Sequence, residues 1–476
     1  MSREPLPTRP PRERVLVCGV LIGDQEPEHG GELTEIRGLV EAAEGELVGT
    51  GIVQRRPRPD PATLMGKGKV EEIAAAIASW RPDAIAVDND LTPAQGRNLE
   101  KAWGVRVIDR SELILDIFTR RAQTRQARLQ VELAQNEYAF PRLRRMWTHL
   151  ERTEGAIGAR GPGETQLETD RRLLRKRIRD LKAELKEIEA RKLREVRSRA
   201  ELFTVGLVGY TNAGKSTLLN RLTGSDELVA DMLFATLDTR TRKWPLSDGR
   251  VALLSDTVGF LRRLPHHLVA SFHATLEETL QADLLLHVVD ASHSDARGQM
   301  AAVDEVLAGI SRHTRADVLV LNKVDRVEDP IQLQLLVDDP GQEVVYVSAI
   351  TGEGLDRLDR TVRRRLDERS ALLDLFLPLA DGRLAAQARR TGVVLEQEVL
   401  GSDCLRLRLR IDEGAFGNLR RAARAHLRFE VVEEPRQPLL AGEGFSRWTR
   451  AAGLSDSPPA PPADGGAGAA RAEGMR

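Results

Sequence analysis

The sequence predicts an α/β protein of several domains, in which a phosphate-binding domain stands between smaller α/β units. Three observations lead to this prediction. Apolar runs alternate with helix-type segments along residues 14–110, which is typical of a mainly parallel sheet. Residues 209–216 read Gly-Tyr-Thr-Asn-Ala-Gly-Lys-Ser, a complete G-x-x-x-x-G-K-S loop between an apolar run and a helix start. Residues 111–200 carry long helix-type segments rich in basic side chains.

Composition narrows the class of protein. The 476 residues allow roughly three or four domains, and 71 Lys and Arg stand against 72 Asp and Glu, so the net charge is close to zero. Two cysteines, Cys18 and Cys404, exclude a disulfide framework and suit a reducing cytosol, and we expect both to be small core residues. The sequence shows no signal-peptide pattern and no uninterrupted apolar run of membrane-spanning length. We therefore expect a cytoplasmic protein without membrane contact.

The first predicted domain covers residues 14–110. Each apolar run there is short enough for a strand, and each amphipathic segment between the runs has helical spacing. A small α/β domain with a mainly parallel sheet is the expected result. Strands are predicted at 15–20, 47–53, 84–87 and 105–108, and helices at 33–43, 69–78 and 91–101.

Residues 111–200 predict a helical hairpin. The first helix should span 111–138 and stop at Pro141, and the second should run from about Glu168 to Arg199. Apolar positions of the second helix step by 4, 3, 4 and 3, the seam of a coiled coil. These positions are Leu174, Ile178, Leu181, Leu185 and Ile188.

The hairpin is strongly basic. Between Arg171 and Arg199 there are 13 basic and 5 acidic side chains, which fits either a solvated helix face or a surface for a phosphate backbone. The linker over 139–170 favours nucleic acid, because its arginines accompany a tryptophan that can stack on a base. These linker residues are Arg142, Arg144, Arg145, Trp147, Arg152 and Arg160.

A nucleotide-binding domain is predicted over 201–370 and a small α/β appendage over 371–450. In the appendage, residues 404–411 alternate strictly, which predicts a strand with one apolar and one basic face. Residues 1–13 and 451–476 have the composition of disordered segments.

The loop at 209–216 has the chemistry of a phosphate cradle. Gly209 and Gly214 let the backbone curl so that N–H groups face phosphate oxygens, and the helix N-terminus adds partial positive charge. Lys215 can reach the terminal phosphates, and the Ser216 hydroxyl can ligate Mg²⁺. The alternative is a glycine-rich turn without a ligand. The complete loop comprises Gly209, Tyr210, Thr211, Asn212, Ala213, Gly214, Lys215 and Ser216.

Two switch segments are expected after this loop. Thr236 is the candidate switch threonine, which closes on Mg²⁺ and the γ-phosphate. Asp256 follows a predicted strand and can hold Mg²⁺ through water, and the Gly259 N–H can sense the γ-phosphate. We assign catalytic roles to Lys215, Thr236 and Gly259. The two segments comprise Phe234, Ala235, Thr236, Leu237 and Asp238, and then Asp256, Thr257, Val258 and Gly259.

Two further segments specify guanine. The Asp325 carboxylate can accept from guanine N1–H and the exocyclic amine, whereas adenine would leave it unpaired, a preference of roughly 10⁴-fold or more. Asn322 should buttress the loop, the Lys323 stem should cover the base, and a backbone N–H near Ala349 should bind the guanine carbonyl. The two segments comprise Asn322, Lys323, Val324 and Asp325, and Ser348, Ala349 and Ile350. All five segments in this order predict a P-loop GTPase domain of the TRAFAC type, with GTP or GDP and Mg²⁺ as ligands.

Phe260 departs from the usual site. Ras-like GTPases carry a glutamine after the D-x-x-G glycine to orient the attacking water, and phenylalanine has no donor or acceptor for that purpose. Either the enzyme is a degraded, slow GTPase, or a conformational change or a partner positions the water. Both alternatives predict slow hydrolysis by the isolated protein.

The segment Arg160-Gly-Pro-Gly-Glu-Thr-Gln-Leu-Glu-Thr-Asp-Arg-Arg172 resembles the signature of the HflX family of translational GTPases. Residues 91–98, 107–116, 129–135 and 209–214 belong to the same resemblance, which covers about 14–365. It implies a cytoplasmic GTPase, partly ribosome-associated, that binds the large (50S) ribosomal subunit, with residues 139–199 reaching rRNA at the peptidyl-transferase region. It also implies stimulation of GTP hydrolysis by the ribosome and a role in splitting or rescuing ribosomes under stress. The hydrophobic residue that the family carries after D-x-x-G matches Phe260.

The sequence also departs from the family pattern. A glycine run before Arg160 is replaced by 154–159, the Glu-Gly-Lys ahead of Leu129 is Gln-Ala-Arg, and switch I reads Asp-Thr-Arg-Thr-Arg at 238–242. None of these changes removes a nucleotide contact. A ribosome assembly or anti-association factor, in which GTP only gates binding, remains an alternative. An RNA-modifying GTPase has no candidate catalytic centre outside 201–370. We expect a monomer.

Overall fold

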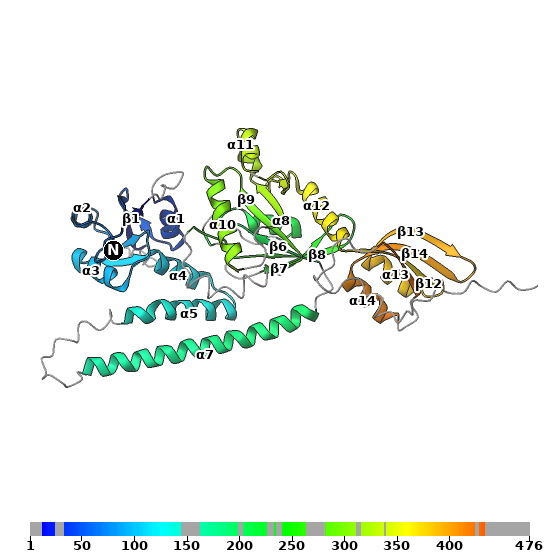
Figure 1. The fold of residues 1–476 in the computed structure, drawn as a ribbon, viewed down its shortest axis with the longest axis horizontal. Helices are drawn as coiled ribbons and strands as arrows, with labels where there is room; N and C mark the ends of the chain where they lie inside the picture. The colour runs from blue at the N-terminus through cyan, green and yellow to red at the C-terminus, as the bar shows by residue number, and fades with distance from the viewer. Residues whose placement is uncertain are drawn as a thin grey trace, which may run out of the picture.

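Three sheets form the framework of the chain, and two long helices run alongside the first two (Figure 1). In Figure 1 the N-terminal sheet, the nucleotide-domain sheet and the C-terminal sheet follow one another from left to right. No helix among the described residues is both long and apolar enough to cross a membrane. The computed structural model describes residues 12–23, 33–143, 162–198, 203–225, 233–234, 240–262, 280, 282–310, 316–337, 339–423 and 428–433.

The N-terminal sheet is parallel, in the order β2-β1-β4-β5 with β3 also paired to β1. Helices cover both faces, so β1 and β4 are buried and apolar almost throughout. The prediction of one strand over 47–53 is wrong. Gly49 and Gly51 have φ angles of 72° and 84°, in the left-handed region, and they interrupt the strand into β2 and β3. The elements are β1 (Arg14–Ile22), α1 (Thr34–Ala42), β2 (Glu46–Leu47), β3 (Ile52–Arg56), α2 (Lys67–Trp80), β4 (Ala84–Val87), α3 (Pro93–Trp103), β5 (Arg106–Asp109) and α4 (Arg110–Arg121).

The helical hairpin begins with a break that the sequence did not predict. Instead of one helix over 111–138, α4 ends at Arg121 and α5 begins at Arg125, because Ala122 is extended and the Thr124 hydroxyl caps α5 by accepting from the Ala127 N–H at 3.1 Å. The break lets α4 pack on the N-terminal sheet while α5 packs on α7. The elements are α5 (Arg125–Ala139), the 3-10 helix η1 (Phe140–Arg142) and α7 (Pro162–Ser198).

Helix α7 starts earlier than predicted. Residues 162–167, which the sequence placed in the linker, are helical, because Pro162 occupies the first turn, where proline fits without loss of a hydrogen bond. The apolar positions predicted to form a coiled-coil seam on α7 pack against α5. Leu181 and Leu185 are buried against Leu129 and Leu133, with Ile178 and Ile188 packed at the margin of this cluster.

The nucleotide domain contains a six-stranded sheet in the order β11-β10-β9-β6-β8-β7. Only β7 is antiparallel among these strands, so the other five end at one edge. Ligands of such sheets bind beyond the carboxyl ends of the strands, and four of the five predicted segments start there. The elements are β6 (Thr204–Val208), α8 (Lys215–Thr223), β7 (Arg240–Pro245), β8 (Val251–Asp256), β9 (Leu284–Asp290), α10 (Ala296–Ile310), β10 (Val318–Asn322), η2 (Val324–Arg326), α11 (Pro330–Leu335), β11 (Glu343–Tyr346) and α12 (Leu355–Glu368).

The C-terminal appendage is an antiparallel sheet in the order β13-β14-β12-β15 with two helices on one face. As predicted, β14 alternates between buried leucines and arginines of the outer face. Two of these arginines, Arg406 and Arg408, pair with Asp374 at 2.8 and 2.9 Å. The elements are β12 (Ala371–Pro378), α13 (Gly382–Thr391), β13 (Val393–Leu400), β14 (Cys404–Ile411), α14 (Glu413–Ala422) and β15 (Arg428–Glu433).

Candidate nucleotide-binding site

The P-loop connects β6 to α8 and owes its shape to two glycines in close contact with neighbouring strands. A Cβ atom on Gly209 would lie 2.2 Å from the Val288 carbonyl oxygen. A Cβ atom on Gly214 would lie 2.3 Å from Nδ2 of Asn322. Gly214 also has a φ angle of 90° immediately before α8. Any larger residue at either position would push the loop away from the strands that support it.

Lys215 and Ser216 are the first two residues of α8. The buried Lys215 ammonium donates to the carbonyls of Gly209 and Tyr210 at 3.1 and 2.8 Å, inside the curl of the loop. Burial lowers the pKa of Lys215 to about 8, although the Asp256 carboxylate acts in the opposite direction. The Ser216 hydroxyl donates to Oδ2 of Asp256 at 2.6 Å. A cation and two hard oxygen ligands therefore converge at the carboxyl edge of the sheet.

The D-x-x-G segment lies against the P-loop through main-chain contacts. The Thr211 N–H donates to the Phe260 carbonyl at 2.8 Å, and the Phe260 N–H donates to the Gly209 carbonyl at 3.1 Å. A Cβ on Gly259 would lie 2.8 Å from Cα of Thr211, so only glycine allows this approach. The Thr257 hydroxyl fixes the start of the segment by donating to the Leu207 carbonyl at 2.7 Å.

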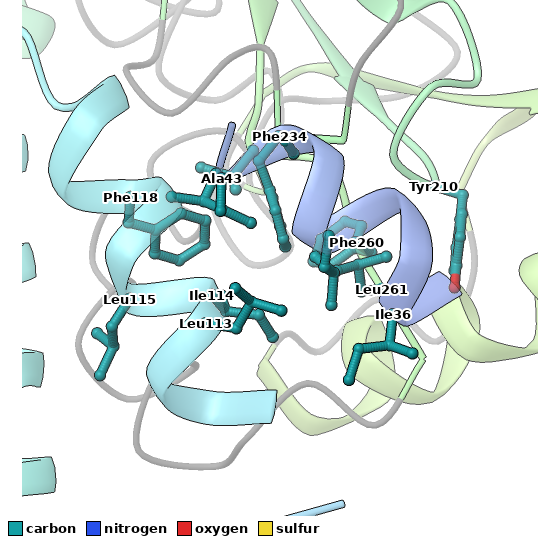
Figure 2. Close-up of a cluster of buried hydrophobic side chains, with 14 of the residues drawn as sticks. Ile36, Ala43, Leu113, Ile114, Leu115, Phe118, Tyr210, Phe234, Phe260 and Leu261 are labelled. Atoms are coloured by element: carbon teal, nitrogen blue, oxygen red, sulfur yellow. The ribbon is translucent and has the colours of Figure 1, made fainter. Parts of the chain in front are cut away.

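The Phe260 side chain leaves the nucleotide site altogether. It is 1% exposed and lies in an apolar cluster shared with the N-terminal domain (Figure 2). Phe234 enters the same cluster, and its ring meets that of Phe118 on α4 edge to face, with centroids 4.7 Å apart. The other predicted switch I residues, Ala235, Thr236, Leu237 and Asp238, lie outside the described residues.

Asn322 joins three of the predicted segments. Its Nδ2 donates to the Ala213 carbonyl of the P-loop at 2.9 Å, and its Oδ1 accepts from the Ala349 N–H at 3.1 Å. Asp325 is exposed in η2, and Val324 beside it donates through its N–H to the Val347 carbonyl at 3.3 Å. The carboxylate predicted to read the base is therefore accessible, and the loop is held immediately before it by Asn322 and the Val324 N–H.

One residue of this region, Asp290, was missed at the sequence level, whereas Ser348 was predicted. Asp290 ends β9 and pairs with the Lys323 ammonium at 2.7 Å, which fixes the stem expected over the base. Its position directly after a buried apolar run was an available signal, because loops at that edge of the sheet meet. Ser348 accepts through its hydroxyl from the Thr351 N–H at 3.1 Å and closes the turn that carries Ile350, which is exposed.

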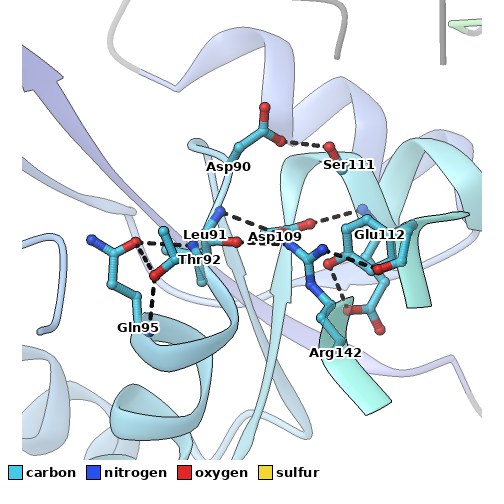
Figure 3. A network of polar contacts seen from close by, with 9 residues as sticks. Asp90, Leu91, Thr92, Gln95, Asp109, Ser111, Glu112 and Arg142 are labelled. Carbon is cyan, nitrogen blue, oxygen red and sulfur yellow. Dashed lines mark hydrogen bonds and ion pairs between the residues drawn. The ribbon is translucent and has the colours of Figure 1, made fainter. Parts of the chain in front are cut away.

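The predicted nucleic-acid surface is only partly described, and Arg142 needs a correction. Its guanidinium donates to the Leu91 carbonyl at 2.7 Å and pairs with Asp109 at 3.1 Å (Figure 3). The same guanidinium lies over the ring of Tyr138. This arginine therefore anchors the hairpin instead of facing solvent, because a carboxylate at the end of β5 neutralises it. The remaining predicted linker residues, Arg144, Arg145, Trp147, Arg152 and Arg160, lie outside the described residues.

Helix α7 presents the basic surface that the structure describes. Phe140 lies beside Arg171 and Arg175, whose guanidinium carbons are 5.6 and 5.1 Å from the ring centroid. Arg177 faces α5 and pairs with Glu132 at 2.6 Å, so part of the positive charge is used within the hairpin. The exposed basic residues of the described helix include Arg172, Arg175, Lys176, Arg179, Lys182 and Lys186.

Comparison with known proteins agrees with this architecture. Three family profiles match successive parts of the chain, described as "GTP-binding GTPase N-terminal" over 31–119, "GTP-binding GTPase Middle Region" over 121–199 and "50S ribosome-binding GTPase" over 204–323. The GTPase HflX of Escherichia coli (strain K12) is 45% identical, with 84% of this chain and 94% of the relative covered. The GTPase HflX of Magnetococcus marinus is 46% identical over 75% of this chain and 83% of the relative. Identity of this extent shows that the chain belongs to the HflX family of GTPases.

Proposed function

We propose that this chain is a GTP-driven switch that binds the large ribosomal subunit through its helical hairpin and splits or rescues ribosomes under stress. The observation that carries the nucleotide part is the convergence of four motifs through Asn322 and Ser216 at one edge of the sheet. The matched profile over 204–323 is described as a 50S ribosome-binding GTPase, which supports the choice of partner. The exposed basic face of α7 supports the choice of surface.

GTP hydrolysis needs charge stabilisation on the phosphates more than covalent help from the protein. Lys215 would neutralise the β- and γ-phosphate oxygens, and N–H groups of the P-loop would donate hydrogen bonds to these oxygens. Asp325 would bind guanine N1–H and its amine, and Gly259 would offer its N–H to the γ-phosphate. Thr236 is proposed to close over the site, as its sequence position indicates.

Mg²⁺ fits the donors that the chain presents. Ser216 and Asp256 offer a hydroxyl and a carboxylate oxygen 2.6 Å apart, and hard oxygen ligands suit this ion. Bound there with GTP, such an ion would supply positive charge that offsets the negative charge of the phosphates. Ser216 would be a direct ligand together with Thr236, and Asp256 would act through water.

The burial of Phe260 supports slow hydrolysis by the isolated protein. A phenyl ring inside an interdomain core cannot orient an attacking water, so residue 260 cannot do what the glutamine after D-x-x-G does in Ras-like GTPases. We infer that the ribosome completes the site, either by supplying a group or by moving the D-x-x-G segment.

Sedimentation with and without nucleotide tests this function. Intact ribosomes incubated with the protein and a non-hydrolysable GTP analogue should shift into free subunits, with the protein on the large one. Binding to free large subunits without loss of intact ribosomes would instead favour an assembly or anti-association factor. Failure to sediment with either particle would contradict ribosome binding altogether.

The surface can be tested with matched charge reversals on two helices. Arg172→Glu with Lys176→Glu changes the exposed face of α7, whereas Arg383→Glu with Arg390→Glu changes exposed positions of α13 by the same charge. Only the α7 variant should lose large-subunit binding, and wild-type binding should fall steeply between about 50 and 200 mM salt because phosphate contacts release counterions. Equal binding by both variants would place the contact elsewhere.

A further inference from the structure

Arg110, the first residue of α4, joins the N-terminal domain to the nucleotide domain. Its side chain is only 2% exposed and donates to three acceptors from three different segments. Nη1 donates to Asp88 at 2.6 Å, and Nη2 donates to Glu35 at 2.7 Å and to the Arg262 carbonyl at 2.8 Å. Burial alone would lower the pKa of Arg110, but the charges of Glu35 and Asp88 outweigh burial and raise it, so the guanidinium stays charged.

The same contacts continue into the P-loop. Oε1 of Glu35 also accepts from the Tyr210 hydroxyl at 3.0 Å, and the Tyr210 oxygen accepts from the Arg262 N–H at 2.9 Å. Both sides of residue 262 are therefore held, its N–H by Tyr210 and its carbonyl by Arg110. Residue 262 lies three positions after Gly259, in the segment expected to respond to the γ-phosphate. Apolar packing of Phe260 and Leu261 against α1 and α4 surrounds this polar cluster (Figure 2).

The residue before Arg110 holds the base of the hairpin. Oδ1 of Asp109 caps α4 by accepting from the Glu112 N–H at 2.9 Å, and its Oδ2 accepts from the Leu91 N–H at 3.2 Å and from Arg142 at 3.1 Å. Figure 3 shows Arg142, the last residue of η1, reaching across to this carboxylate and to the Leu91 carbonyl. Of these two consecutive residues, Asp109 therefore binds the hairpin through Arg142, and Arg110 binds the segment after Gly259 through the carbonyl of residue 262.

We propose that Asp109 and Arg110 form a junction through which large-subunit binding at the hairpin changes the affinity of the nucleotide site, with Arg110 as the positioning residue. The proposal rests on the function proposed above. Adjacent residues at a capped helix start cannot shift independently, because the peptide between them is rigid and the cap fixes both. A displacement of Arg142 by bound RNA would therefore move Arg110 relative to its three acceptors and release residue 262.

The geometry makes Arg110 difficult to replace. A guanidinium spans three acceptors with a planar fork, whereas a lysine ammonium is a compact charge that cannot contact all three from the same stem. Arg110→Lys should keep the buried charge but loosen the hold on the switch. Arg120→Lys is the matched control, since it lies on the same helix with its side chain 48% exposed.

The test is a thermodynamic cycle of two bindings. The dissociation constant of a fluorescent non-hydrolysable GTP analogue is measured with and without saturating large subunits, for wild type, Arg110→Lys and Arg120→Lys. Coupling between two sites is typically about 5- to 150-fold and must be reciprocal, so the analogue should tighten large-subunit binding by the same factor. The wild type and Arg120→Lys should show this factor, and Arg110→Lys should bring it close to one while each ligand still binds alone.

Each result has one meaning. An unchanged factor in Arg110→Lys would overturn the junction and leave the proposed function intact. If the wild-type protein binds large subunits equally well with and without nucleotide, the proposed GTP switch is wrong. This result comes from the wild type alone, before any variant is measured. If Arg110→Lys unfolds, Tyr210→Phe removes the hydroxyl that links Glu35 to residue 262 and must also reduce the factor; retention of the full wild-type factor by Tyr210→Phe would likewise overturn the junction.

Discussion

Replacing Asn322 with alanine should weaken guanine-nucleotide binding strongly, because this side chain connects three segments of the nucleotide site. Its amide donates to the Ala213 carbonyl at 2.9 Å and its oxygen accepts from the Ala349 N–H at 3.1 Å. Asn322 is 1% exposed, so water cannot readily replace either partner once the loops are ordered. Alanine would leave one buried acceptor and one buried donor unpaired.

The expected magnitude follows from these two groups. Each buried backbone group left without a partner costs about 1–3 kcal/mol, so the pair costs about 2–6 kcal/mol if neither finds water. Relaxation of the loops in the nucleotide-free protein offsets part of this cost. We expect about 3 kcal/mol, which corresponds to a loss of about 150-fold in GDP affinity at 1.4 kcal/mol per tenfold change.

Titration with fluorescent GDP measures the effect, and urea unfolding shows whether the variant remains folded. Asn98→Ala is the matched control, since its Nδ2 also donates to a backbone carbonyl, that of Ala62 at 2.9 Å, in an exposed part of the N-terminal domain. The control should bind GDP like the wild type. A folded Asn322→Ala protein with wild-type GDP affinity would refute the reasoning, because the two hydrogen bonds would then not support the site.

Three other perturbations have defined outcomes. Asp325→Asn should weaken GTP and GDP binding by about 1.5–3 kcal/mol and relax base choice, because the charge-assisted pair to guanine is lost; competition with other nucleoside triphosphates measures this, and an unaltered preference would exclude the assignment. Lys215→Ala and Ser216→Ala should each abolish phosphate release, because phosphate charge or the metal loses a partner; near-normal release from both would show that the active site lies elsewhere. Burial, with a smaller contribution from Lys215, lowers the pKa of His287 from 6.5 to about 4, so the unfolded chain binds more protons between these values and stability should fall as pH drops through that range. The loss between pH 7 and pH 5 is about 2 kcal/mol, which His287→Leu should abolish in urea unfolding; an equal acid loss in wild type and variant would contradict it.

Local signals were sufficient for several elements of the fold. Residues 84–87 are continuously apolar, and residues 404–411 alternate between apolar and basic side chains. Both patterns are typical of strands, and the two segments form β4 and β14 with the predicted bounds. The errors occurred where a local feature opposed the pattern. Gly49 and Gly51 adopt left-handed φ angles that divide a predicted strand, and Thr124 caps a second helix within a predicted single one. The two glycines and the capping threonine were visible in the sequence, but the apolar pattern on either side of them led to the prediction of a continuous strand and a continuous helix.

The candidate site shows a different limit of sequence reasoning. Motif spacing predicts the P-loop and the segments at 256–259, 322–325 and 348–350, because phosphate and guanine impose fixed chemistry on few positions. Motifs say nothing about the partners of their side chains. Arg142 appeared among arginines and was assigned to RNA, although the folded chain places Asp109 beside it at 3.1 Å.

The sequence by itself determined the nucleotide chemistry, the family resemblance and the order of the domains, because these depend on residues close together in the chain. Only the tertiary structure decided how the domains meet. Glu35, Arg110 and Tyr210 lie far apart along the chain, yet they form one buried cluster against residue 262. Such a cluster has no periodicity or spacing, since charged side chains of the N-terminal domain meet a hydroxyl and main-chain groups of the nucleotide domain only where the two domains pack. These contacts between the domains therefore exist only in the folded chain.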